Sequence, residues 1–458
     1  MVGPRIIVVG AGPAGIRCAE ALVAAGIRPT VIDEGRRDGG QIYRRQPENF
    51  TRSYEGLYGA EASRAQAVHR SFDAIREHID YLSDTVVWNI AERHVYALSG
   101  SQHGALPFDA LVLCTGATDR LMPIKGWNFA GTYSLGGAQV ALKSQACAIG
   151  QRVAFMGTGA LLYLVAAQYI KAGAKVVAVL DTSPRFRRVT ALRKLLALPE
   201  VLWKGVALEF ALRRAGTPIF AGVEPLQIDG DPQSGVRGLS FKDSGGRVHH
   251  IECDAVGLGY HLRPETQLAD LARCEFRFDT QSRQWLPQVD VDGRSSVQGV
   301  YLAGDGVRVL GANAAEASGQ LAALAALKDL GHAVSSEAIE ALRGTLATLQ
   351  RFAHGLAEAF PWPAQQAARL SDDTIVCRCE SVTVGELRSV VQNKGSCEAN
   401  RAKAFSRVGM GRCQGRYCGH AAAEIIAHAA GVPLEQVGRL RGQAPVKPLP
   451  IAITGDVE

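Results

Sequence analysis

The stretch that decides the fold is Arg5–Gln41, RIIVVGAGPAGIRCAEALVAAGIRPTVIDEGRRDGGQ. A β-branched run, Ile6–Val9, leads into a glycine turn, Gly10–Gly15, and apolar residues then recur at helical spacing up to a stop at Gly26. A second short strand is expected at Thr30–Ile32. Strand, glycine turn, helix and strand in this order are the context in which a GxGxxG motif indicates dinucleotide binding.

Each glycine of the motif has a physical role. Gly10 allows the tight turn, Gly12 lets the backbone approach a pyrophosphate, and Gly15 lets the helix pack closely on the strand. The N-terminus of the helix supplies N–H donors to the phosphates. Glu34 follows the second strand, where a carboxylate accepts from a ribose hydroxyl. The nucleotide-binding residues predicted here are Gly10, Gly12, Pro13, Ala14, Gly15 and Glu34.

Three further segments give the chain a resemblance to the two-dinucleotide-binding-domain flavoproteins, the glutathione-reductase-like superfamily. They are Glu34–Gln41 (EGRRDGGQ), Phe108–Trp127 with Thr115 and Gly116, and Gly299–Leu327 with Asp305. The resemblance implies that the first site holds FAD and that Asp305 accepts from the ribityl chain. It adds to the predicted site Gly40, Gln41, Thr115, Gly116, Gly304 and Asp305.

A second nucleotide-binding pattern occupies Gln151–Arg185: strand, Gly157-Thr-Gly159, helix, strand, and Asp181. In the same superfamily this domain binds NAD(P)H. Here Leu162 stands at the third glycine position, where a bulky side chain opposes close helix–strand contact. We therefore expect this domain to keep the fold without binding NAD(P), and to serve as a structural relic or a subunit interface.

Four of the ten cysteines form two close pairs, Cys377-x-Cys379 and Cys413-x4-Cys418. The other six are scattered singly, so the redox dithiol of disulfide reductases is missing. Four thiolates suit zinc or a [2Fe-2S] cluster. The CxC and CxxxxC spacing resembles the [2Fe-2S] domain named after bacterioferritin-associated ferredoxin, in copies fused to flavin dehydrogenases. The resemblance implies that all four cysteines ligate one [2Fe-2S] cluster.

Composition sets the remaining bounds. A chain of 458 residues is too long for a single hydrophobic core, so we expect several domains. Its net charge is +6. The densest basic run, Ser183–Leu196, is interpreted as a solvated helix face rather than a nucleic-acid patch. We expect no signal peptide and no transmembrane segment. Free clustered cysteines favour a reducing, cytoplasmic compartment.

The predicted fold class is α/β, with two dinucleotide-binding, glutathione-reductase-like Rossmann-type domains and a small helical [2Fe-2S] domain. Helices are expected at Thr383–Asn393 and His420–Ala430, and a linker at Ala359–Asp373. The predicted domains are a first part of the FAD domain (1–145), an NAD(P)-binding-like domain (146–261), a second part of the FAD domain with linker (262–373), the [2Fe-2S] domain (374–430) and a tail (431–458).

Nearly the whole chain resembles the α subunits of bacterial hetero-oligomeric amine and amino-acid dehydrogenases: opine oxidases, D-hydroxyproline and proline dehydrogenases, and hydrogen cyanide synthase. The resemblance rests on Gly39–Arg44, Gly157–Leu162, Gly257–Leu268 and Arg439–Ile451. It implies a flavin-containing β subunit that oxidises a C–N bond, with an interface FMN and a small γ subunit in some members. The α subunit then relays electrons to a respiratory acceptor, which would make it peripheral to the inner membrane through its partners.

No catalytic residue is named, because no localised carboxylate-binding constellation is found. Tyr260, His261 and Arg263 come nearest, and we interpret them as structural or interface residues. Two alternatives stay open: a self-contained NAD(P)H-dependent FAD/[2Fe-2S] reductase, and a scaffold subunit that binds a nucleotide without turnover.

Overall fold

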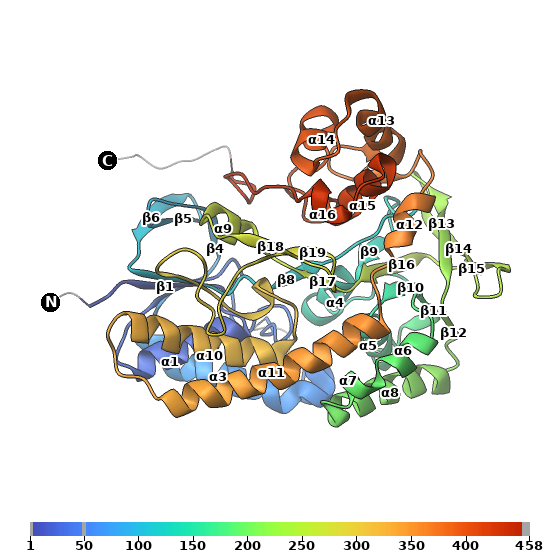
Figure 1. Cartoon of the computed structure of the whole chain (residues 1–458). Helices are drawn as coiled ribbons and strands as arrows, with labels where there is room; N and C mark the ends of the chain where they lie inside the picture. Colours follow the sequence, from blue (N-terminus) through green and yellow to red (C-terminus); the bar gives the residue numbers. More distant parts are fainter. Residues whose placement is uncertain (1–2, 48–51, 451–458) are drawn as a thin grey trace.

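The computed structural model describes residues 3–47 and 52–450, and it contains two parallel five-stranded sheets (Figure 1). The first sheet has the order β20-β7-β1-β2-β3. Its strands are β1 (Ile6–Val9), β2 (Thr30–Ile32), β3 (Asp80–Leu82), β7 (Ala110–Leu113) and β20 (Val300–Leu302). The expected strand, glycine turn, helix and strand of the N-terminal motif are thus present.

The first sheet is covered on both faces, as its run of buried apolar residues requires. Ile6 and Val8 pack with helices α1 (Pro13–Ala24), α3 (Ala62–Ile75) and α10 (Ala312–Asp329). Ile7 and Val9 point the opposite way, toward an antiparallel sheet. That sheet consists of β4 (Thr85–Ala91), β5 (His94–Ser99) and β6 (Gln102–Pro107).

The second sheet has the order β12-β11-β10-β16-β9. Its strands are β9 (Thr132–Ser134), β10 (Arg152–Thr158), β11 (Lys175–Asp181), β12 (Ile219–Ala221) and β16 (Ala255–Tyr260). Helices α4 (Leu135–Ser144), α5 (Ala160–Lys171) and α8 (Pro199–Arg214) pack on one face, together with short α6 (Phe186–Thr190) and α7 (Leu192–Leu195). The antiparallel strands β13 (Glu224–Asp231), β14 (Gly235–Lys242) and β15 (Val248–Glu252) lie on the other.

The two sheets are joined by β8 (Ala117–Asp119), which pairs antiparallel with β17 (Leu262–Pro264). The chain leaves the first sheet after β7, builds the second, and returns through this pair to β20. The remaining elements of this body are α2 (Tyr54–Tyr58), η1 (Gly59–Glu61), η2 (Arg76–His78), α9 (Gln267–Leu271), β18 (Phe276–Asp279), β19 (Gln284–Pro287), η3 (Gly304–Gly306) and α11 (Ser336–Ala359).

The C-terminal unit lies at one end of the molecule, above the second sheet in Figure 1. It contains β21 (Ile375–Cys377), β22 (Val382–Thr383), α13 (Val384–Lys394), α14 (Ala399–Ser406), α15 (Gly419–Ala430) and α16 (Leu434–Val437). The two helices expected there are thus present. Helix α13 begins with a capping box between Thr383 and Glu386, which satisfies two backbone donors.

The stretch expected as a linker is instead packed. It contains helix α12 (Ala364–Arg369), Ala367 is fully buried, and the Trp362 indole donates to the Glu424 carboxylate at 3.0 Å. Residues of the second sheet and of the C-terminal unit share one hydrophobic core, so the unit is fixed on that sheet. No helix among the described residues is both long and apolar enough to cross a bilayer.

Candidate functional site

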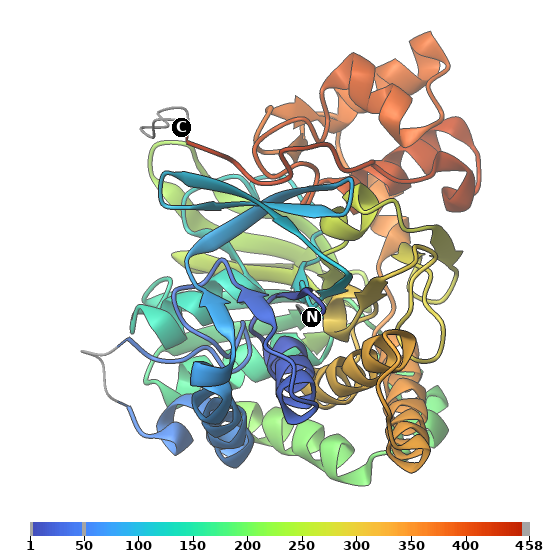
Figure 2. The ribbon, with the colours of Figure 1, turned by 90° about the vertical axis from the view of Figure 1, so that its left-hand side faces the viewer.

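A cavity of about 1790 Å³ opens at the carboxyl ends of the first sheet's strands, where ligands bind in parallel α/β sheets. Eleven of the twelve cofactor residues predicted from the sequence line it: Gly10, Gly12, Pro13, Ala14, Glu34, Gly40, Gln41, Thr115, Gly116, Gly304 and Asp305. The N-terminal elements, coloured blue, face the viewer in Figure 2. One cavity therefore gathers motifs that are about 300 residues apart.

The glycine turn is built as the motif requires. Gly10 has a φ of +107°, and a Cβ there would overlap the Cys114 carbonyl oxygen. Gly15 does not line the cavity. It packs against the turn, where a Cβ would overlap the Gly10 carbonyl oxygen. Helix α1 begins at Pro13 with Gly12 as its N-cap, so its free amides face the cavity that Gly12 lines.

Asp33, which the sequence reasoning missed, is the acidic side chain that contacts the glycine turn. Its carboxylate accepts from the Ala11 amide at 2.5 Å and from the Gly35 amide at 2.6 Å. Burial raises the pKa of Asp33, against the lowering effect of these two amides. Glu34 also lines the cavity, but its side chain is exposed and forms an ion pair with Lys447 of the tail at 2.6 Å. The adjacent carboxylates Asp33 and Glu34 both qualify for the ribose contact.

Asp305 lies where the sequence places it, at the end of β20 and beside helix α10. Its Oδ1 accepts from the amides of Leu310 and Gly311, at 2.9 and 3.1 Å. Its Oδ2 receives no hydrogen bond from the described residues. Burial raises the pKa of this carboxyl group. A partly buried carboxylate with one oxygen unused, on a cavity wall, fits a cofactor hydroxyl as its partner.

The second nucleotide site is filled by the protein's own side chains. Asp181, at the end of β11, is fully buried and accepts from Thr158, Tyr163, Ser183 and Arg188 at 2.6–2.9 Å. A carboxylate with four side-chain donors has little capacity left for a ribose. Burial, followed by the negative charge of Asp181, raises the pKa of the Tyr163 phenol.

The phosphate end of that site is occupied too. A Cβ on Gly159 would lie 2.9 Å from Nδ1 of His261, whose Nε2 donates to the Phe360 carbonyl. The Phe360 ring contacts Tyr163 at 6.2 Å, centroid to centroid. His261 thus has a structural role here, as the sequence analysis interpreted it. Leu162 is fully buried, as its place against the sheet requires.

The four clustered cysteines come together in the C-terminal unit as two pairs. The Cys377 thiol lies beside that of Cys418, and the Cys379 thiol lies beside that of Cys413. Cys377 and Cys418 are buried, whereas Cys379 is exposed and Cys413 partly so. No three His, Cys, Asp or Glu side chains of residues 3–47 and 52–450 are gathered tightly enough for a single ion. Two pairs fit the two irons of a [2Fe-2S] cluster better than one tetrahedral zinc.

Of the two buried cysteines, Cys377 has the electrostatics of a thiolate ligand. The pKa of Cys377 is lowered to about 6, first by its hydrogen bond with Cys418 and also by the amides of Gly409, Glu380 and Cys379. The bond with Cys377, together with burial, raises the pKa of Cys418. Amides that point at sulfur stabilise a thiolate. The four cysteines therefore fit the [2Fe-2S] cluster and would be the residues that hold it.

One residue connects the nucleotide cavity with the cysteine loop. The Glu265 amide donates to the Gly116 carbonyl at 2.9 Å, and Thr115 Oγ1 donates to the Glu265 carbonyl at 2.6 Å. The Glu265 carboxylate pairs at 2.7 Å with Arg416, which lies between Cys413 and Cys418 in the chain. Sequence reasoning missed Glu265, because nothing local in the sequence marks its partner.

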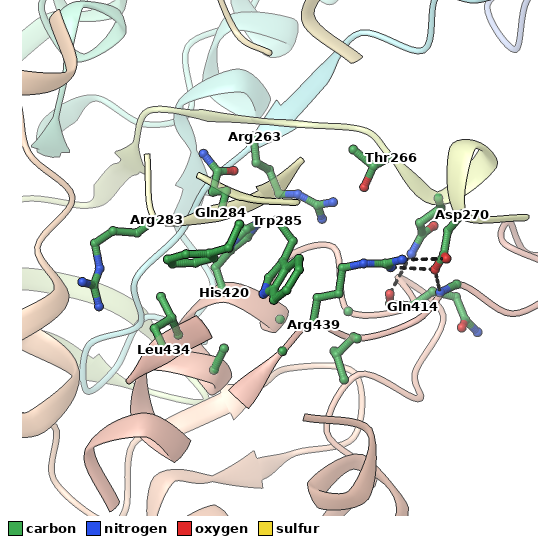
Figure 3. A pocket seen from close by; sticks show the side chains of 18 residues that line it. Arg263, Thr266, Asp270, Arg283, Gln284, Trp285, Gln414, His420, Leu434 and Arg439 are labelled. Atoms are coloured by element: carbon green, nitrogen blue, oxygen red, sulfur yellow. Dashed lines mark hydrogen bonds and ion pairs between the residues drawn. The ribbon is translucent and has the colours of Figure 1, made fainter. Parts of the chain in front are cut away.

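A small cavity of about 80 Å³ lies at the same contact (Figure 3). Arg439 pairs with Asp270 across it at 2.7 Å, and Gln267 donates to the Gln414 carbonyl at 2.8 Å. Arg263 is buried there and donates to the Arg416 carbonyl at 3.0 Å. Within this chain Arg263 therefore has a structural role, because it holds the cysteine loop through the Arg416 carbonyl. Buried polar contacts fix the position of the cysteine loop relative to the nucleotide cavity.

The fold and these two sites define a nucleotide-binding oxidoreductase that carries its own iron–sulfur domain. The chain belongs to the pyridine nucleotide-disulphide oxidoreductase family, whose model matches residues 4–320. The model of the BFD-like [2Fe-2S] binding domain matches residues 375–428. Both parts of the predicted fold class are confirmed, and the chain is an FAD-dependent oxidoreductase with a [2Fe-2S] cluster.

Several relatives match this chain over almost its whole length. The A subunit of opine oxidase from Rhizobium meliloti is 38% identical over 98% of this chain and 86% of that protein. The A subunit of opine oxidase from Agrobacterium tumefaciens is 36% identical over 98% of this chain and 90% of that protein. The HcnB subunit of hydrogen cyanide synthase from Pseudomonas aeruginosa is 29% identical over 98% of this chain and 97% of that protein. The resemblance to this group of subunits is therefore confirmed.

Among solved structures, L-proline dehydrogenase from P. horikoshii superimposes with a TM-score of 0.70 at 18% identity. The match covers 99% of this chain and 80% of that chain. Thioredoxin reductase from T. acidophilum gives a TM-score of 0.54 at 20% identity, over 71% of this chain and 98% of that chain. At these identities the likeness shows the fold alone.

Proposed function

We propose that this chain is the flavin and iron–sulfur α subunit of a hetero-oligomeric dehydrogenase for amino or imino acids, of the opine, D-hydroxyproline or proline type. A flavin-containing β subunit oxidises the substrate, and this chain carries the electrons onward to a respiratory acceptor. Support comes from relatives named as the A subunit of opine oxidase and the HcnB subunit of hydrogen cyanide synthase, which match over almost the whole chain.

The observation that carries the proposal is the filled second nucleotide site. Asp181 is saturated by its own neighbours, and His261 lies against Gly159, so NAD(P)H has no prepared place to bind. Electrons must then enter from another source. A partner subunit is the source that the relatives' names suggest.

The chain's own residues serve the relay by holding two sites in a fixed relation. Flavins accept electron pairs and an iron–sulfur cluster accepts single electrons, so together these cofactors convert a two-electron oxidation into one-electron steps. Glu265 and Arg416 tie the wall of the nucleotide cavity to the loop between Cys413 and Cys418. The distance between the two cofactors is therefore set by buried contacts within one chain.

A cytoplasmic location is part of the same proposal. All ten cysteines are free thiols, which suits a reducing compartment. Any attachment to the inner membrane would then be made through partner subunits.

The test is anaerobic reduction of the purified complex. The chain is co-expressed with a flavoprotein subunit encoded by a neighbouring gene, and opines, D-hydroxyproline and proline are added one at a time. We expect one substrate class to bleach the flavin at about 450 nm and to give the signal of a reduced cluster. NADH and NADPH serve as controls and should bleach nothing. Rapid reduction of the isolated chain by either nucleotide would instead favour a self-contained reductase.

A further inference from the structure

Exposed apolar side chains are concentrated in one segment of the second nucleotide-binding region. Of the thirteen large hydrophobic residues that are exposed in the described part of the chain, seven lie within 25 residues. We call this set the α6–α8 face, and its exposed fractions are 44–73%. Its members are Phe186, Val189, Leu192, Leu196, Trp203, Val206 and Phe210.

The geometry of α8 makes this face a ridge. Trp203, Val206 and Phe210 recur at helical spacing on one side, while Leu212 is fully buried in the core that α8 shares with α5. At 60–69% exposure, the three aromatic side chains of the face alone present about 300–500 Å². This summed area is comparable to the largest apolar patch of a typical monomer, which favours a role in binding a partner.

The charge of the same segment indicates what kind of partner. Residues 185–214 contain eight Arg and Lys but only two Glu, a net charge of +6. Ion pairs with acids outside the segment, Asp181, Glu358 and Glu61, offset three of these cations, which leaves +3. The remaining residues of the chain are balanced at 42 basic and 42 acidic. A basic segment around an apolar ridge favours a partner with acidic residues around an apolar hollow.

A second copy of this chain fits poorly. A two-fold contact would place the same face on both sides and bring one basic segment against another. The relatives are named as subunits, which points to a different polypeptide.

The position of the face suits electron entry. Lys204 of α8 pairs at 2.9 Å with Glu61, and Glu61 lines the large cofactor cavity. A protein seated on α8 would therefore reach the edge of that cavity. The cysteine unit, α13–α16, lies at the opposite end of the molecule in Figures 1 and 2. It stays free for an acceptor.

We propose that the α6–α8 face docks the substrate-oxidising subunit, through an apolar contact centred on Trp203 and Phe210 with an acidic rim on the partner. This inference rests on the proposed function and names the surface by which the partner binds. A standard interface buries about 800 Å² on each side, so the contact would extend beyond the aromatic side chains onto the basic residues around them.

The test uses the co-expressed complex and the double variant W203E/F210E. Large aromatic side chains at an interface centre are the ones whose loss weakens binding most, so we expect affinity to fall about 30-fold or more. The matched control is V248E/F405E, which changes two residues of similar exposure outside the face. Retained flavin and cluster absorbance shows that each variant is folded. Complex formation is followed by size-exclusion chromatography with light scattering.

A charge test runs beside it. Reversing Arg213 and Arg214 to Glu should slow association and reduce its dependence on salt. Equal complex formation by W203E/F210E and the control overturns the inference. Two other results would also overturn it. In the first, W203E/F210E abolishes self-association of the isolated chain while the subunit complex persists. In the second, the same variant abolishes binding to phosphatidylglycerol vesicles while the subunit complex persists.

The two proposals fail in different ways. A complex that forms but is reduced by no substrate argues against the proposed function and leaves the docking surface standing. A complex that is reduced by substrate but survives W203E/F210E argues against the docking surface alone.

Discussion

The ion pair between Glu265 and Arg416 is the contact whose loss should matter most for the cysteine unit. The two side chains are only 9% and 10% exposed, and their atoms lie 2.7 Å apart. Replacing Glu265 by Ala leaves the Arg416 guanidinium buried without its counter-charge. Breaking a buried pair in this way costs about 3–5 kcal/mol, against about 0–1 kcal/mol for an exposed pair.

The assay is denaturant unfolding followed by the visible circular dichroism of the cluster. We expect E265A to lower the unfolding free energy of the cysteine unit by about 3–5 kcal/mol. E265Q keeps a hydrogen-bond acceptor and should lose less. The double variant E265A/R416M removes the lone buried charge, so its cost should be smaller than the sum of the single costs.

The pH dependence follows from the sign of the shift. Burial raises the pKa of Glu265, but the charges of Arg263 and Arg416 outweigh it and lower the pKa overall in the folded protein. The stability that its carboxylate contributes is then complete above the unfolded pKa of about 4.3, and it is lost as pH falls through the folded pKa. The difference between wild type and E265A should therefore be constant from about pH 5 to 8. A loss below about 1 kcal/mol for E265A, or additive costs in the double variant, would refute the reasoning.

Three further outcomes are expected. Neither NADH nor NADPH bleaches the flavin of the isolated chain, because Asp181 is saturated by its own neighbours; stopped-flow absorbance at about 450 nm checks this. C413S removes the visible absorbance of the cluster while FAD stays bound, since none of the four clustered cysteines lines the nucleotide cavity. Iron, sulfide and flavin analysis decides it. D33A weakens FAD retention more than E34A, because the Asp33 carboxylate holds the Ala11 amide of the glycine turn. Each lost charged hydrogen bond is worth about 1.5–3 kcal/mol, and equilibrium dialysis of FAD measures the loss.

The sequence by itself predicted much of the local structure, and its resemblance to known families predicted the two cofactors. The glycine turn at Gly10–Gly15 could be predicted because its φ angles and close contacts exclude other residues. The four cysteines by themselves suited zinc or a [2Fe-2S] cluster, and the resemblance of their spacing to a known [2Fe-2S] domain favoured the cluster. The helices of the C-terminal unit followed from apolar periodicity, which the structure confirms in α13 and α15.

Tertiary structure decided which distant side chains meet. Glu265 and Arg416 are 151 residues apart, and nothing local in either segment marks the pair. The same holds for Phe360 and His261, which fill the second nucleotide site from distant parts of the chain. Leu162 indicated that this site had changed, but only the fold shows what occupies it. Short-range patterns specify backbone geometry, whereas long-range contacts depend on how whole elements pack, and a single sequence carries no local record of that packing.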